Sequence, residues 1–413
     1  MFAAALLAVG PAAAETVIGG NVDSLLQFAR ARHPEFAAMR LEAEAAQARV
    51  QPAGALPDPV LRMELRDVTN RGTDAGPNLL PSRVGSTKYT VIQPLPWFGK
   101  RDLREAAAAA GAEEAEGRAE GGWADLALRI KQTYAQHHYH QAALRLGYES
   151  LDLMARIEEI ARTRYGAGLA PQQDVIRAQT EQTAMRSDLA AMEGDSAQAS
   201  ARMRNLLGRP SGVKLRPPDA LRPMPAPARL DFAALEGRLQ AANPWLRAEG
   251  ARIRTAESNR ELAYRNRYPD FSLGVSPIQS RNRVSEWELM VELNIPLQQE
   301  SRRSQEREAE RMLEAARLRR EATLNQVLAD LSESLAGLEA ARRLENLAAA
   351  NLLPEAELGF QSALAAYENG KVDFATLLDA QRQIRKARQD IVKARADQRM
   401  RLAEIERLVG EDL

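Results

Sequence analysis

The chain has 413 residues, no cysteine, a formal net charge of zero, and 27% charged against 5% aromatic residues. This composition excludes a disulfide-stapled scaffold, and the balanced charge gives no basic excess with which to bind nucleic acid. The common zinc-protease, phosphate-binding and serine-hydrolase motifs do not occur in the sequence, so neither catalysis nor a cofactor is expected.

The chain opens with MFAAALLAVGPAAAET, a short apolar segment that ends in Ala12, Ala13 and Ala14. This pattern is typical of a secretory signal peptide over residues 1–14, with a mature chain that begins near Glu15. The positively charged segment that usually opens such a peptide is missing, so either the signal is weak or the true start lies upstream. The alternative to export is an apolar but cytosolic N-terminus. Export is the preferred interpretation.

The first half of the mature chain, residues 15–208, places helical runs on either side of two short alternating segments. A helix is expected from about residue 22 to 53, because Ala, Arg and Glu dominate this stretch. At 59–68, Leu61, Met63 and Leu65 occupy every second position, which is the period of a strand with one apolar face. A second strand is expected at 86–94. A long helix at 101–165, a chain reversal at 165–172 and a return helix complete this half.

A proline-rich connector at 209–229 leads to a second half, residues 230–413, that repeats the layout of the first. Strands are expected at 270–277 and 285–295, and the second of them carries apolar residues at alternate positions. These residues are Trp287, Leu289, Val291 and Leu293. The long helix that follows contains Pro354, which is expected to kink or break it. The chain then reverses at 367–374 and returns to about Val409.

Both chain reversals share one motif. Tyr165 and Gly168 are spaced as Tyr367 and Gly370 are, and each pair is followed by Ala-Gln in the return helix. Apolar residues recur three and four apart in the second return helix, which predicts a coiled-coil seam. They are Leu377, Ala380, Ile384, Ala387, Ile391 and Ala394. The predicted fold is mainly α with a small β part, built from a duplicated unit of helix, two strands, long helix, hairpin tip and return helix.

The duplicated layout, the two Tyr-x-x-Gly reversals and the corner QPLPWFGKR at residues 93–101 together resemble the TolC family of outer-membrane efflux channels. The resemblance implies a homotrimer whose chains share a 12-stranded β-barrel in the outer membrane of a Gram-negative cell and a long periplasmic α-helical barrel. The implied partners are a periplasmic adaptor (membrane fusion protein), an inner-membrane pump and outer-membrane lipid. The PLPWFGKR corner is most similar to members that serve heavy-metal cation pumps.

The resemblance also implies roles for residues of the two hairpin tips. The best-known member of the family carries two aspartates three residues apart that ring the narrowest point, and this sequence has Thr376 and Asp379 at the matching positions. Tyr367 and Asp174 match a tyrosine and an aspartate that hold the tip closed, whereas Val372 replaces an arginine of the same latch. The implied gate therefore has a single acidic ring and a looser or different latch.

Four further tip residues match positions that meet the adaptor in the family: Gly168, Leu169, Gly370 and Lys371. The two glycines have a second and compatible explanation, because a chain reversal often needs a residue with positive φ.

The alternating apolar residues of the strands are expected to face lipid. They are Leu61, Met63, Leu65, Trp287, Leu289, Val291 and Leu293. The alternative is that these strands pack against another protein domain.

The segment HHYH places His137 and His140 three residues apart on one face of the first long helix, where two imidazoles could contact a metal ion transiently. No cysteine or carboxylate is evident at ligand spacing beside them. A solvated helix surface is therefore the preferred interpretation, and no bound metal is expected.

The leading hypothesis is a passive outer-membrane exit duct of a tripartite RND-type efflux system that conducts heavy-metal cations. One alternative keeps the duct but assigns it to organic toxic compounds or to type I protein secretion. Another alternative, of a different class, is a soluble periplasmic coiled-coil adaptor or scaffold. The strand-like alternation at residues 287–293 argues against the soluble protein.

Overall fold

The computed structural model describes residues 19–68, 79–81, 84–208, 215–280 and 283–413, and the expected signal peptide lies outside them. The chain forms two compact units. The first contains the chain up to Ala38 together with Glu120–Asn243 and Asn325–Leu413, and the second contains Met39–Ala119 and Pro244–Leu324. Each unit thus takes segments from both of the repeats predicted from the sequence.

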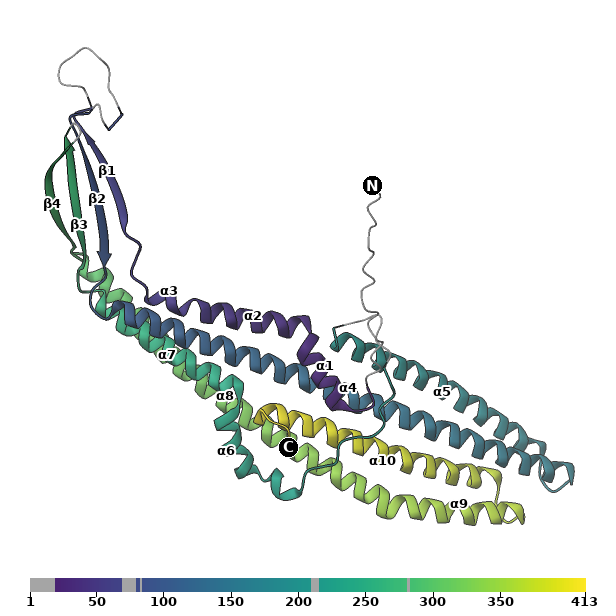
Figure 1. The fold of residues 1–413 in the computed structure, drawn as a ribbon. Helices are drawn as coiled ribbons and strands as arrows, with labels where there is room; N and C mark the ends of the chain where they lie inside the picture. The colour runs from purple at the N-terminus through teal and green to yellow at the C-terminus, as the bar shows by residue number, and fades with distance from the viewer. Residues whose placement is uncertain (1–18, 69–78, 82–83, 209–214, 281–282) are drawn as a thin grey trace, which may run out of the picture. The chain divides into compact units, whose positions relative to one another are not determined.

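The second unit contains a four-stranded antiparallel sheet in the order β1-β2-β3-β4 (Figure 1). Its strands are β1 (Val60–Arg66), β2 (Ser86–Leu95), β3 (Asp270–Ser280) and β4 (Arg283–Asn294). All four overlap the segments in which apolar and polar residues alternate. The prediction of a mainly helical chain with a small β part is confirmed.

The two faces of this sheet differ in chemistry. Leu61, Val91, Val275 and Leu289 stand opposite one another across the four strands, and all four side chains are exposed. The other face buries a hydrogen bond of 2.8 Å between the hydroxyls of Thr90 and Ser276. One face of the sheet is therefore apolar and open, while the other is polar and internally bonded.

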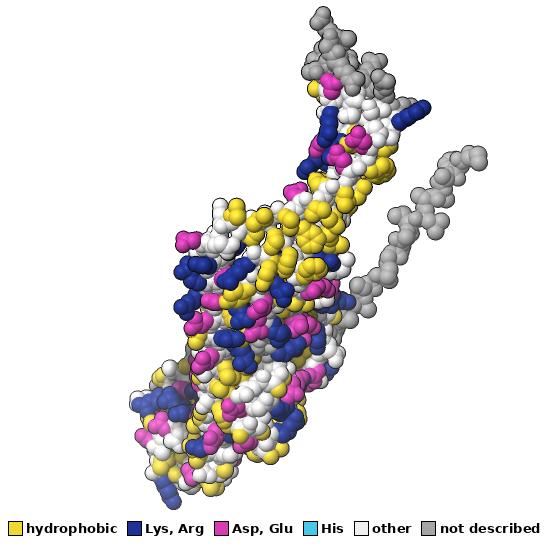
Figure 2. Space-filling view, turned by 90° about the vertical axis from the view of Figure 1, so that its left-hand side faces the viewer, with side chains coloured by type: hydrophobic (Ala, Val, Ile, Leu, Met, Phe, Trp, Pro, Cys, Tyr) yellow, Lys and Arg dark blue, Asp and Glu magenta, His cyan; other side chains and the backbone are white. Residues whose placement is uncertain are grey.

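The strand residues expected to face lipid lie on the apolar face, and six of the seven are exposed. Leu65 is the exception, because its side chain is half-buried. Further exposed apolar residues, Phe98, Ile295 and Leu297, occur where the sheet meets the adjoining helices. Figure 2 shows hydrophobic side chains gathered in this region of the surface.

The corner at residues 93–101 joins β2 to α4 (Lys100–Gly166). The Lys100 ammonium donates to Asp270 Oδ1 at 2.8 Å and to the Tyr268 carbonyl at 3.1 Å. The same Asp270 oxygen accepts the Trp97 backbone N–H at 2.7 Å, and the Trp97 ring stacks on Tyr268 with centroids 5.2 Å apart. The corner therefore fixes the start of α4 to the start of β3.

The glycines within α4 do not interrupt it. Gly117 lies against α7 (Pro244–Arg265), where an added Cβ would come 3.0 Å from the Ala248 nitrogen. Glycine in a helix costs about 1 kcal/mol relative to alanine, but here it allows two backbones to approach closely. Packing between helices thus explains why the helix tolerates this residue.

The first part of the chain is less continuous than predicted. The expected helix at 22–53 is instead three helices: α1 (Val22–Arg32), α2 (Pro34–Ala48) and α3 (Val50–Gly54). His33, between the first two, adopts φ −69° and ψ 121°. The residue before a proline avoids the helical conformation because the proline ring would clash with it, and Pro34 imposes this break.

The first unit contains two helical hairpins (Figure 1). One joins the end of α4 to α5 (Gln172–Leu206), and the other joins α9 (Leu353–Glu368) to α10 (Phe374–Val409). The predicted seam of α10 is confirmed, since Leu377, Ile384, Ala387, Ile391 and Ala394 are buried and Ala380 packs beside the cluster. Two shorter segments lie around the start of the second half: η1 (Pro227–Leu230) at the end of the connector, and α6 (Phe232–Ala242) as its first helix.

The expected effect of Pro354 appears as a change of helix type. α8 (Gln299–Leu347) passes into a π-helical segment, η2 (Ala348–Leu352), and α9 then carries Pro354 in its first turn. A proline lacks an N–H and crowds the carbonyl four residues earlier, and a π turn relieves both effects without ending the helix.

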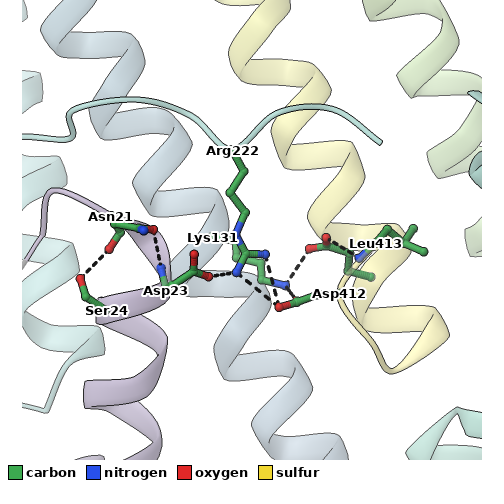
Figure 3. A network of polar contacts seen from close by, with 8 residues as sticks. Asn21, Asp23, Ser24, Lys131, Arg222, Asp412 and Leu413 are labelled. Atoms are coloured by element: carbon green, nitrogen blue, oxygen red, sulfur yellow. Dashed lines mark hydrogen bonds and ion pairs between the residues drawn. The ribbon is translucent and has the colours of Figure 1, made fainter. Parts of the chain in front are cut away.

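A network of ion pairs, which we call the clasp, joins the connector to α1 and to the C-terminal end of the chain (Figure 3). Arg222 of the connector pairs with Asp23 of α1, and it also approaches Asp412 Oδ2 at 3.3 Å. Lys131 of α4 pairs with Asp412 and, at 2.6 Å, with Glu406 Oε2 of α10.

The hydropathy of the described helices is low. Within the residues described, none of them combines the length and the apolar character that crossing a membrane requires.

Candidate functional site: the two hairpin tips

The two Tyr-x-x-Gly reversals have the same backbone hydrogen bonds. In the first, Leu169 N–H donates to the Arg164 carbonyl at 2.8 Å and Gly168 N–H donates to Tyr165 at 2.9 Å. In the second, Lys371 N–H and Gly370 N–H make the corresponding bonds to Ala366 and Tyr367 at 2.8 and 2.9 Å. This pair of bonds is a Schellman motif, which ends a helix on a residue in the left-handed conformation.

The glycines of the motif carry that conformation. Gly168 has φ +72° and Gly370 has φ +71°. Other residues adopt such angles only at a cost in free energy, so glycine at these two positions has a local structural reason.

The tyrosines of the two tips have different surroundings. Tyr165 is 45% exposed, whereas Tyr367 is only 3% exposed and donates from its hydroxyl to Asp174 Oδ2 at 3.0 Å. Burial, and then the hydrogen bond to Asp174, raises the pKa of Tyr367 well above its usual value of 10. Tyr367 therefore stays protonated and donates a hydrogen bond from the second tip to the first.

An apolar cluster supports this hydrogen bond. Phe374, the first residue of α10, is fully buried and meets the Tyr367 ring edge-on, with centroids 5.6 Å apart. Met154, Ile157 and other buried residues of both hairpins belong to the same cluster. Because residues of both hairpins are buried together, the two tips of one chain form one packed unit.

Thr376 helps to begin α10. Asp373 caps the helix by accepting the Thr376 backbone N–H at 3.0 Å and the Thr376 hydroxyl at 2.6 Å. These hydrogen bonds lower the pKa of Asp373. Thr376, which stands where the sequence comparison expects one of two aspartates, thus directs its hydroxyl at the helix cap Asp373.

Asp379 has a cationic neighbour. Its side chain is 68% exposed, and Oδ1 lies 3.6 Å from Arg382 Nη1. Arg382 also donates to Glu181 of α5, at 2.6 and 3.3 Å. These three residues and Arg177 line one groove between α5 and α10, and their four charges sum to zero. The predicted acidic position is therefore part of a charge-balanced group.

The structure also identifies a tip residue that sequence reasoning missed. Arg164, in the last turn of α4, donates to the carbonyl of Glu368 at the end of α9 and to the Leu169 carbonyl at 3.1 Å. Its guanidinium carbon lies 5.1 Å from the centroid of the Tyr367 ring. The signal that could have found it is the repeat itself, because Arg164 corresponds to Ala366 in the second copy of the motif.

The residues expected to meet an adaptor lie at the surface of the tips. Leu169 is 66% exposed, and Gly168, Gly370 and Lys371 are exposed as well. An apolar side chain directed to solvent at a hairpin end is available for a contact with another protein.

The interpretation of HHYH as solvated helix surface is wrong for His137, which is only 6% exposed. Burial lowers the pKa of His137, as do His140 and His138, so the ring is neutral at neutral pH. Burial lowers the pKa of His138 as well, and so do the cations Arg145 and Arg399. Among the described residues no three His, Cys, Asp or Glu side chains are grouped for a metal ion.

Solved structures share this fold. The CusC channel structure is 19% identical with a TM-score of 0.81, and the match covers 98% of this chain and 96% of that one. The outer membrane protein VceC from Vibrio cholerae is 16% identical with a TM-score of 0.80, over 95% and 96% of the two chains. The open MtrE channel of Neisseria gonorrhoeae is 16% identical with a TM-score of 0.76, over 98% and 94%.

A comparison with curated proteins gives no match. The sequence profile of outer membrane efflux proteins, in contrast, matches residues 25–209 and 235–411, which is most of the chain. The two matched segments fall in the two halves of the duplicated sequence. Members of this family are outer-membrane channels that conduct passively, and they are not enzymes. This chain therefore belongs to the outer membrane efflux protein family.

Proposed function

We propose that three copies of this chain form the outer-membrane exit duct of a tripartite efflux system. The duct would conduct substrate passively from an RND-type inner-membrane pump and a periplasmic adaptor to the exterior. The three sheets would close into one 12-stranded barrel, and the helical hairpins would extend into the periplasm with their tips at the entrance.

The observation that carries this proposal is the sheet. β1 pairs with β2 and β4 pairs with β3, so each edge of the four-stranded sheet lacks a partner within the described chain. Unpaired backbone groups are too costly in hydrocarbon, which admits only closed barrels or helices. Three such sheets joined edge to edge would satisfy both edges of every copy, with the exposed apolar face turned to lipid.

The tips support an entrance that can open and close. The hydrogen bond between Tyr367 and Asp174 joins the two hairpins of one chain at their ends. In this proposal it belongs to the gate, and Asp379 and Thr376 stand at the narrowest point. Gly168, Leu169, Gly370 and Lys371 form the surface that meets the adaptor.

For the substrate we propose heavy-metal cations. The support is the resemblance of the corner sequence at 93–101 to that of members that serve heavy-metal cation pumps. The TM-scores against solved channels span only 0.76 to 0.81 for the three structures compared above, so fold similarity favours no substrate.

The channel is tested with the purified full chain in detergent and in planar lipid bilayers. We expect a trimer that needs detergent for extraction and that inserts to give discrete conductance steps. A monomer that is extracted without detergent and gives no conductance would contradict the proposal and favour the soluble periplasmic scaffold.

The substrate is tested by deleting the gene and comparing growth inhibition by zinc, cobalt, cadmium and copper with inhibition by dyes, detergents and antibiotics. Hypersensitivity to metals that is reversed by the intact gene supports cation efflux. Hypersensitivity to organic compounds alone would make the protein a multidrug duct instead.

A further inference from the structure

Arg164 contacts both hairpin tips of the chain. Its two terminal nitrogens donate to the carbonyls of Glu368 in the second hairpin and Leu169 in the first. An added Cβ at Gly370 would come 3.4 Å from Arg164 Nη2, so the guanidinium also packs against the second Schellman turn. Arg164 thus bridges a helix end, its own turn and the turn of the opposite hairpin.

The chemistry of these contacts favours an arginine. Glu368 is the last residue of α9, and the carbonyls at the end of a helix carry partial negative charge that attracts a cation. The planar guanidinium can donate to two carbonyls in different directions while its carbon lies near an aromatic ring. A lysine at this position would keep the charge but lose the fork and the flat surface.

The repeat supplies an internal comparison. The corresponding position in the second tip is Ala366, and the corresponding tyrosine of the first tip, Tyr165, is exposed and outside the buried cluster. Arg164 of the first tip lies against Tyr367 of the second tip, and Tyr367 is the tyrosine that reaches Asp174. Duplication produced two similar turns, and only one combination of residues joins them.

We propose that Arg164 is a positioning residue of the gate. It ties the two tips of one chain together and holds the Tyr367 ring where its hydroxyl reaches Asp174, and opening requires that the guanidinium releases the Glu368 carbonyl. The proposal rests on the channel function proposed above. In this proposal the latch arginine is Arg164 of the first tip. Val372 occupies the position in the second tip where relatives carry an arginine.

The test uses the full-length trimer in planar lipid bilayers, with Arg164→Ala and Arg164→Lys. We expect Arg164→Ala to raise the resting conductance several-fold and Arg164→Lys to restore part of the closure. Arg162→Ala is the matched control, because Arg162 lies two residues away and its ion pairs among the described residues, with Glu158 and Glu159, all run along its own helix. Its conductance should equal that of the unaltered protein.

A second comparison separates positioning from a general structural role. If Arg164 acts through Tyr367, then Tyr367→Phe should raise conductance as well, and the double variant should add little to the larger single effect. The melting temperature of the trimer in detergent should change little in each variant. A lowered melting temperature with unchanged conductance would overturn the proposal.

The failure of this inference is distinct from the failure of the proposed function. If the unaltered protein conducts and Tyr367→Phe opens it while Arg164→Ala does not, Arg164 has no part in the gate. If the unaltered protein gives no conductance at all, the channel function is wrong and the inference falls with it.

Discussion

The guanidinium of Arg382 lies close enough to Asp379 to screen part of the negative charge of its carboxylate. It contacts both Asp379 and Glu181, and Glu181 is the more buried partner, with 11% of its side chain exposed. The Glu181 contact is bidentate and short, whereas the contact to the exposed Asp379 is long. The guanidinium therefore belongs mainly to Glu181 and screens Asp379 only in part.

This arrangement predicts opposite effects for two substitutions. Asp379→Asn should weaken block of the channel by a multivalent cation such as hexaamminecobalt, because the carboxylate is lost. Arg382→Gln should strengthen block, by up to about fivefold, since an exposed ion pair is worth about 0–1 kcal/mol. The measurement is the concentration for half-block in a planar bilayer, with Arg395→Gln as a control that alters a pair farther along α10. Equal block in all variants would remove Asp379 from the ion path.

Sequence reasoning reached some of these residues and missed others for a physical reason. The resemblance pointed to Tyr367 and Asp174, and the structure brings their side chains within 3.0 Å. Arg164 and Arg382 occur in helical runs of mixed charge, which usually form solvated surfaces. Arg164 contacts Glu368 and Tyr367, and Arg382 contacts Glu181, on the opposite hairpin, so no spacing within one helix reveals these contacts.

Among the elements, the hairpin turns give the clearest relation between a residue type and a conformation. Gly168→Ala would place a side chain at φ +72° with no neighbouring atom within 4 Å of the new Cβ, so only backbone strain is added. That strain should cost about 1 kcal/mol, which is about fivefold in the local opening equilibrium. The Leu169 amide, bonded to the Arg164 carbonyl, should exchange its hydrogen about fivefold faster.

Gly166→Ala is the control for this measurement. Gly166 is the last residue of α4, has no atom within 4 Å of an added Cβ, and its φ is outside the left-handed region. Alanine there should leave exchange at Leu169 unchanged or slower. Faster exchange in both variants would mean that the turn requires small residues rather than a positive φ.

Element types were largely predictable, and the irregularities less so. Alternation located the strands because one face of the sheet is mostly apolar. The break at His33 follows from Pro34 and could have been anticipated. The π-helical segment before Pro354 could not, because a proline can equally kink a helix or end it, and packing in the folded chain decides.

On the scale of the whole molecule, the open edges of the sheet favour the proposed assembly of several copies of the chain. Each repeat supplies two strands, and the two pairs meet where β2 lies beside β3. The sheet still has two free edges within the described residues. Such an edge in water is a site for pairing with another chain, and in lipid it has to be paired. A closed barrel of such copies needs four strand pairings per chain. The chain itself makes three, β1 with β2, β2 with β3 and β3 with β4, and assembly would supply the fourth.

The lipid contact can be tested on adjacent residues of β4. Val291 stands opposite Leu273 on the apolar face, and Glu292 stands opposite Ser272 on the other face. An arginine on the lipid face of a membrane barrel costs about 2–4 kcal/mol near the bilayer midplane, and a trimer would carry it three times. Val291→Arg should therefore deplete the trimer from the outer-membrane fraction, whereas Glu292→Arg should leave it in place. If both variants assemble normally, the apolar face does not contact lipid, and these strands instead pack against protein.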